Sequence, residues 1–144
     1  MRGEVDGVTV SAFDYSYVTG GGRSRQTHRQ TVATMSLPAL ALPGFELRPE
    51  NIFHKIGSAL GFQDIDFPEA PVFSKAFLLR GAEEAAIRSA FRSGVLSFFE
   101  RHQGTSAEGR GRNLVYYRAS RTLKPAEVRA FLNDGRELAR LFVG

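Results

Sequence analysis

The 144-residue sequence contains no cysteine, which excludes disulfide bonds and every kind of thiolate chemistry. It also lacks any run of about 18 apolar residues, so it offers no candidate transmembrane helix. The first residues, Met1-Arg2-Gly3-Glu4, lead into no apolar segment of the kind found in a signal peptide, and we expect none. Lysine is scarce, since all but three of the 19 basic residues are arginine.

What is present indicates an ordered protein. Hydrophobic residues make up 42% and charged residues 24% of the chain, a balance that predicts a folded core, and the length predicts one domain, residues 1–144. The net charge of +4 would suit a polyanionic partner. The arginine bias of a GC-rich genome would produce the same modest excess, and salt would screen it. Both interpretations stay open.

Alternating apolar and polar residues predict strands at residues 5–18, 26–35, 45–48 and 73–80, and a hairpin over 105–118 that turns within 109–113. In the first strand the apolar face moves by one residue between Ala12 and Phe13, which predicts a β-bulge or a change of packing. Residues 37–44 form a proline-bracketed extended connector, and residues 62–72 an ordered loop.

Helical spacing predicts three helical regions. A helix of about 11 residues follows Pro49, which suits a first turn. A second helix begins near Ala82 and breaks at Ser93, which we expect to cap a further helical piece. The last helix begins at Pro125, and its buried stripe comprises Val128, Phe131, Leu132, Gly135, Leu138, Leu141 and Phe142. Glycine in that stripe would let another element approach closely.

The element order β-β-β-α-β-α(α)-β-β-α, with short connections, predicts an α+β fold in which an antiparallel sheet carries its helices mainly on one face. One core is expected to include Phe53, Ile56, Phe77, Leu79, Phe91, Phe131 and Leu138.

Four segments together support a family resemblance: FDYSYVTGGGRSRQTHRQTVATM, LPGFELRPENIFHKIG, GFQDIDFP and FSKAFLLRG. With them the chain resembles an uncharacterised bacterial family whose soluble domain typically follows one or two N-terminal transmembrane helices. The resemblance covers most of the chain and implies a membrane-tethered, cytoplasmic domain. It implies no reaction, cofactor or functional residue, because none is assigned to that family.

A glycine-rich, basic turn between the first two predicted strands is the leading candidate binding surface. Glycine amides and guanidinium groups could together hold a phosphate or a carboxylate, and exposed tyrosines could add contact area. The residues concerned are Tyr15, Tyr17, Gly20, Gly21, Gly22, Arg23, Arg25 and Arg29. The spacing matches no nucleotide-binding glycine motif, and a solvated, mobile hairpin tip is the alternative interpretation.

An acidic loop supplies the candidate site of an enzyme. Asp64, Asp66 and Glu69 lie close in sequence to His54, but the pattern does not match a calcium loop. These carboxylates are more simply explained as acceptors of backbone N–H groups or partners of arginine. The histidines, His28, His54 and His102, have no metal-binding spacing, and we expect neither a metal nor another cofactor.

A second basic stretch contains Arg110, Arg112, Arg118, Arg121 and Lys124 around Tyr116 and Tyr117. Adjacent tyrosines in a strand point to opposite faces, so at most one could stack on a base, and nucleic acid is an improbable partner. The sequence therefore favours a non-enzymatic interaction or regulatory domain that binds a protein or a small anion. The alternative is an enzyme whose site comprises His54, Asp64 and Asp66.

Overall fold

The computed structural model describes residues 2–50, 64–119 and 121–144. Its elements follow one another in the order β1 Arg2–Val5, β2 Val8–Thr19, the 3-10 turn η1 Gly22–Ser24, β3 Gln26–Ser36, β4 Leu42–Pro49, α2 Pro71–Ala76, β5 Phe77–Arg80, α3 Glu84–Ala90, α4 Ser93–Arg101, β6 Ser106–Gly111, β7 Asn113–Tyr117 and α5 Pro125–Val143. The helix predicted after Pro49 falls on residues 51–63, outside the described residues.

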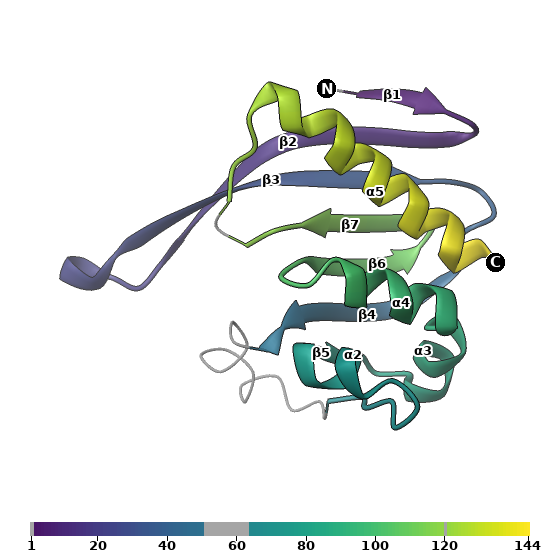
Figure 1. Cartoon of the computed structure of the whole chain (residues 1–144). Helices are drawn as coiled ribbons and strands as arrows, with labels where there is room; N and C mark the ends of the chain where they lie inside the picture. The colour runs from purple at the N-terminus through teal and green to yellow at the C-terminus, as the bar shows by residue number, and fades with distance from the viewer. Residues whose placement is uncertain (1, 51–63, 120) are drawn as a thin grey trace.

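The described strands form one seven-stranded sheet in the order β1-β2-β3-β7-β6-β4-β5. Every neighbouring pair is antiparallel. The β6–β7 hairpin turns at residues 111–112, as the sequence predicts, and lies between β3 and β4, which are neighbours in the sequence. Helices α2–α5 lie on one face of the sheet (Figure 1). The predicted α+β class with helices on one face is confirmed.

The strand β1 was not anticipated by the sequence patterns above. Asp6 and Gly7 connect it to β2 with φ angles of 53° and 79°, the left-handed geometry that a two-residue hairpin turn requires. The pair Asp-Gly between extended segments is a strong hairpin signal, and it marks this turn in the sequence.

Of the two interpretations of the shift near Ala12, the bulge is wrong and the change of packing is confirmed. β2 and β3 pair without interruption from Thr9–Ser36 to Thr19–Gln26. The apolar residues move to the other face of the strand because the helices cover only its first part. Val8, Val10 and Ala12 are buried beneath the helices, whereas Phe13 belongs to the opposite face and is 46% exposed. An unbroken strand thus carries apolar residues first on one face and then on the other.

The strand predicted at residues 73–80 is wrong in its first half, where the chain forms α2. Pro71 occupies the first turn of this helix, a position that needs no N–H donor. The helix buries Phe73, which stacks on Phe77 with ring centroids 5.3 Å apart. Strand structure begins only at Phe77, and β4 begins at Leu42, three residues earlier than predicted.

The break between α3 and α4 is confirmed, but its details differ from the prediction. α3 begins at Glu84 rather than near Ala82, and it ends at Ala90. Ser93 is the first residue of α4 and does not cap it. Arg92 occupies the capping position, but its side chain makes no hydrogen bond to the first turn of α4. Arg92 instead donates to the carbonyl oxygens of Leu141 and Phe142 at 3.0 and 2.6 Å, which satisfies the end of α5.

The helices and the sheet enclose one hydrophobic core. Phe77, Leu79, Phe91, Phe131 and Leu138 all belong to it, as predicted, while Phe53 and Ile56 lie outside the described residues. α5 crosses the sheet over β2, β3 and β7 (Figure 1). A Cβ atom on Gly135 would lie 2.7 Å from the sulfur of Met35, so glycine allows the close approach that the sequence predicts. None of the described helices has the length and apolar character needed to cross a membrane.

Replacement of Phe131 by alanine should lower the free energy of unfolding by about 3–5 kcal/mol. The ring is buried and stacks on Tyr116 at 5.1 Å, so its loss leaves a cavity beneath α5. Phe13→Ala is the matched control, because it removes the same ring from an exposed position. Denaturant unfolding measures both; a loss below about 1 kcal/mol for Phe131→Ala would contradict the packing of α5 described here.

Candidate functional site

The β2–β3 hairpin extends well beyond its neighbours in the sheet. β1 pairs with β2 only as far as Ser11, and β7 pairs with β3 only from Val32 onward. Residues 12–19 and 26–31 therefore form a two-stranded ribbon, and Figure 1 shows it projecting past the body of the molecule. We call this segment, with the turn that joins its strands, the projecting hairpin.

The tip of the projecting hairpin is a hydrogen-bonded turn. Ser24 donates from its N–H and from its hydroxyl to the carbonyl of Gly21, at 3.2 and 2.9 Å. Gly20 and Gly22 adopt φ angles of 74° and 58°, a region that other residues rarely occupy. The glycines therefore serve the shape of the turn, and the mobility expected of it stays a prediction.

The basic residues of the projecting hairpin are exposed. Arg23 belongs to η1, Arg25 follows it, and Arg29 lies opposite Ser16 on β3. None of the three forms an ion pair with an acidic residue in the described part of the chain. Five other arginines do form such pairs, namely Arg48, Arg88, Arg101, Arg121 and Arg140. The unpaired guanidinium groups leave the tip with an uncompensated positive charge.

The aromatic residues of the projecting hairpin gather on one face. Tyr15 is 50% exposed and lies 6.0 Å from Tyr17, centroid to centroid. Tyr17 stacks on His28 at 4.8 Å, and the Thr19 hydroxyl lies 2.8 Å from Nε2 of His28, within hydrogen-bonding distance. Since side chains alternate along a strand, Arg29 points to the other face. The structure thus brings the two tyrosines together but separates them from Arg29.

The base of the projecting hairpin is anchored to the segment before α5. The hydroxyl of Thr31 donates to Oδ1 of Asp14 at 2.7 Å and accepts the N–H of Leu123 at 2.8 Å. The N–H of Thr31 donates to the carbonyl of Arg121 at 3.0 Å. Beside this anchor lies a groove of about 800 Å³, lined by Asp14, Tyr15, Ser16, Thr27, His28, Arg29, Thr122 and Leu123.

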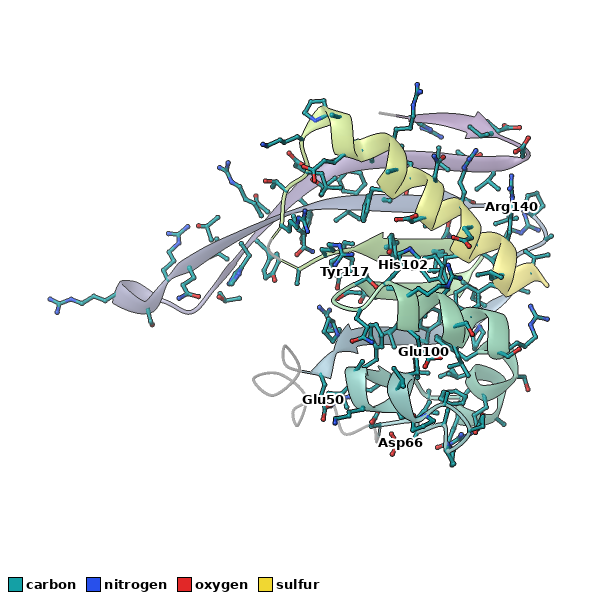
Figure 2. The ribbon with its side chains drawn as sticks, in the orientation of Figure 1. Glu50, Asp66, Glu100, His102, Tyr117 and Arg140 are labelled. Carbon is teal, nitrogen blue, oxygen red and sulfur yellow. The ribbon has the colours of Figure 1, made fainter. Side chains whose placement is uncertain are left out.

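The acidic loop has a structural explanation for one of its carboxylates. Oδ1 of Asp64 accepts the N–H of Leu79 at 2.9 Å, and the backbone carbonyl of Asp66 accepts from Arg88 at 2.6 Å. Burial raises the pKa of Asp64 to about 6; the bond from Leu79 opposes this rise, and a hydrogen bond with Asp66 adds to it. Asp66 lies at the same end of the molecule as Glu50 (Figure 2). His54 is outside the described residues, so its convergence with this pair stays a prediction.

Neither metal binding nor base stacking finds support in the described residues. Within residues 2–50, 64–119 and 121–144, no group of three His, Asp or Glu side chains is placed so that it could hold a metal ion. Tyr116 and Tyr117, the aromatic pair of the second basic stretch, are both buried. Burial raises the pKa of Tyr117 to about 12. Neither ring is available as a platform for a nucleotide base.

A charged cluster on the sheet face opposite the helices was missed by the sequence analysis. Glu46 and Glu108 lie directly opposite each other on β4 and β6, an arrangement that is unfavourable for like charges. Arg48 pairs with Glu46, lies 3.8 Å from Glu108, and covers the ring of Tyr117 at 5.8 Å. Burial raises the pKa of Glu108. The signal was present as the alternation of charged and apolar residues in β4.

This charged cluster borders a groove of about 790 Å³. Arg110 and Asn113 also line it, together with Glu46, Glu108 and Val115. Arg48 contacts both glutamates and offsets part of their charge, and we assign the cluster to the stability of the sheet.

Comparison with known proteins gives one informative likeness. No protein-family model and no curated protein match the sequence. The fold is similar to the crystal structure of the mycobacterial trehalose monomycolate transport factor A, TtfA, with a TM-score of 0.54 and 14% sequence identity. The match covers 99% of this chain and 77% of that one. At this identity the likeness shows a shared fold.

Replacement of Asp64 by asparagine should change how stability depends on pH. The pKa of Asp64 is raised from 3.8 to about 6, so the native state binds the proton more tightly than the unfolded chain. Wild-type stability from this group therefore falls as the pH rises through that interval. Asparagine keeps the acceptor for Leu79 but cannot ionise.

The melting temperature of Asp64→Asn relative to wild type should consequently be higher at about pH 8 than at about pH 4. Asp64→Ala is the control, since it also removes the acceptor and should lower the melting temperature at both pH values. Thermal melts at the two pH values measure the differences. An equal difference between Asp64→Asn and wild type at both values would contradict the assignment.

Proposed function

We propose that this chain is a non-enzymatic interaction domain and that the projecting hairpin captures an acidic partner protein or a small anion. The observation that carries the proposal is the ribbon itself, which extends beyond β1 and β7 with no further strand of the described chain beside it (Figure 1). A protein that needed the hairpin only for stability would cover its exposed rings, and Phe13 and Tyr15 are about half exposed.

The charge of the hairpin supports an acidic partner. Arg23 and Arg25 stand at the tip, and each guanidinium can form paired hydrogen bonds with a carboxylate or a phosphate. Asp14 is the only acidic residue between Asp6 and Glu46, and Thr31 already donates a hydrogen bond to it. The hairpin therefore attracts negative charge and has little of its own to offer a basic partner.

We further propose that the domain serves as an accessory factor beside a membrane, tethered there and located in the cytoplasm. The family resemblance of the sequence supports the tether. The fold shared with TtfA, named a transport factor, supports a role in transport for this chain. The substrate in that name is not part of this proposal.

The alternative function is an enzyme with a polar site comprising His54, Asp64 and Asp66. The raised pKa of Asp64 favours it, since a general acid or base needs a pKa near neutrality. The bond from the Leu79 N–H gives Asp64 a structural role in β5 and favours the interaction domain instead.

Replacement of Arg23 and Arg25 together by alanine should leave the melting temperature nearly unchanged, because both side chains are exposed and lack an ion pair with a described residue. The double variant should bind a hexaglutamate peptide about tenfold more weakly than wild type at low salt, and the difference should shrink at high salt. Calorimetric titration measures the binding. Inorganic phosphate, titrated in parallel, tests the small-anion form of the proposal.

The control is the double variant Arg112→Ala/Arg129→Ala, which removes the same charge from exposed positions outside the hairpin. An equal loss of binding in this control would show that net charge alone attracts the peptide. Unfolding of the Arg23→Ala/Arg25→Ala variant would show that these arginines are structural, and the proposal would lose its main support.

A further inference from the structure

Over much of its length the outer edge of β2 has no neighbouring strand among the described residues. β1 occupies this edge only from Val8 to Ser11, where the pairing ends with Arg2 opposite Ser11. Beyond Ala12 the edge continues for seven residues, 13–19, along the projecting hairpin. Figure 1 shows that the N-terminal end of β1 lies near the start of the ribbon, while β2 continues past it.

The hydrogen-bonding direction along this edge follows from the anchor at Thr31. The Thr31 N–H points away from β2, because it donates to Arg121. The N–H and C=O groups of its neighbours Gln30 and Val32 therefore point toward β2, where these residues pair with Tyr15 and Phe13. The intervening residues of β2, namely Asp14, Ser16 and Val18, consequently direct their N–H and C=O groups to the outer edge.

This edge lacks three of the features that commonly protect an exposed strand. Edge strands commonly contain a proline, a lysine or a bulge that prevents another strand from adding. Residues 13–19 contain no proline and no lysine, and the pairing with β3 is regular throughout. The other side of the ribbon is different, since the segment at Arg121 and Leu123 binds the base of β3.

The charge and the aromatic face indicate what would fit the edge. A strand added in line with β1 runs antiparallel to β2, so its N-terminal end lies beside the tip of the hairpin, near Arg23 and Arg25. Acidic residues at that end would be attracted there. The residues that follow lie beside Phe13 and Tyr15, whose exposed rings would pack against apolar side chains on every second position.

We propose that the outer edge of β2, residues 13–19, binds an extended segment of a partner protein as an added antiparallel strand in line with β1. The segment begins with acidic residues and continues with alternating apolar residues. Main-chain hydrogen bonds to Asp14, Ser16 and Val18 supply the binding, and the basic tip selects the segment and its direction. This inference rests on the proposed function of the hairpin and specifies how the partner binds.

The test uses the synthetic peptide Glu-Glu-Glu-Val-Thr-Val-Thr-Val and three protein variants. Ser16→Pro removes the outward N–H donor from the middle of the edge, and Ser16→Ala retains it, so the second is the matched control. The third variant, Arg23→Ala/Arg25→Ala, removes the charge of the tip. Two further peptides test geometry: the same peptide with its order reversed, and one methylated at the nitrogens of alternate residues.

The first peptide should bind the wild-type protein and slow hydrogen exchange at the amides of Asp14, Ser16 and Val18, measured by NMR. Ser16→Pro should weaken binding about tenfold, and Ser16→Ala should have little effect. The reversed peptide should bind more weakly. Peptide methylated on the edge that faces β2 should not bind, and this result does not depend on how Ser16→Pro folds.

Three results would overturn the inference, and they differ in whether the proposed function of the hairpin still holds. If all peptides bind alike and no amide is slowed, but Arg23→Ala/Arg25→Ala weakens binding, charge capture holds and strand addition fails. If no peptide binds, or if neither set of variants changes binding, the proposed function of the hairpin fails as well. If the amides slow with rising protein concentration in the absence of peptide, and light scattering shows a dimer, a second copy of the chain occupies the edge.

Discussion

The pairing of β3 with β7 holds the two halves of the sheet together. Five residue pairs, from Val32 with Tyr117 to Ser36 with Asn113, join strands β1–β3 to strands β4–β7. α5 covers this junction, where Phe131 stacks on Tyr116 and Gly135 admits Met35. Because the junction is shorter than β3, the rest of β3 runs past it together with β2. The hairpin therefore projects because β7 is shorter than β3 and pairs with only part of it.

Much of the fold could be predicted because local patterns and tertiary packing agree. In α5 and in the β6–β7 hairpin, the structure that the local sequence favours is also the one that packs well against the core. The predictions failed where packing decided between local alternatives. Phe73 could face the core from a strand or from a helix, and Pro71 together with the stacking on Phe77 favours the helix. At Phe13 the sequence left a bulge and a change of packing open, and the pattern of one strand could not decide between them because the covering helices are remote in sequence.

The candidate site was predictable in composition but only partly in geometry. The glycines and arginines between two strands identified the tip, since such turn residues act locally. Strand alternation places Tyr15 and Tyr17 on one face, yet Arg29 joins the opposite face because its position depends on the register of β3 against β2. The cluster of Arg48 with Glu46 and Glu108 depends on three strands meeting, and sequence distance conceals it.

The charge of the hairpin has two opposite effects on the open edge. A two-stranded ribbon whose edge has no neighbouring strand in the described chain is open to pairing with another copy of itself. Residues 13–19 have neither proline, lysine nor bulge to prevent this. The unpaired arginines at the tip repel a second tip and attract an acidic segment. Both effects are electrostatic, so both weaken as salt screens the charges. In the proposed binding mode, the basic tip would therefore provide the selectivity of the edge rather than its capacity to pair.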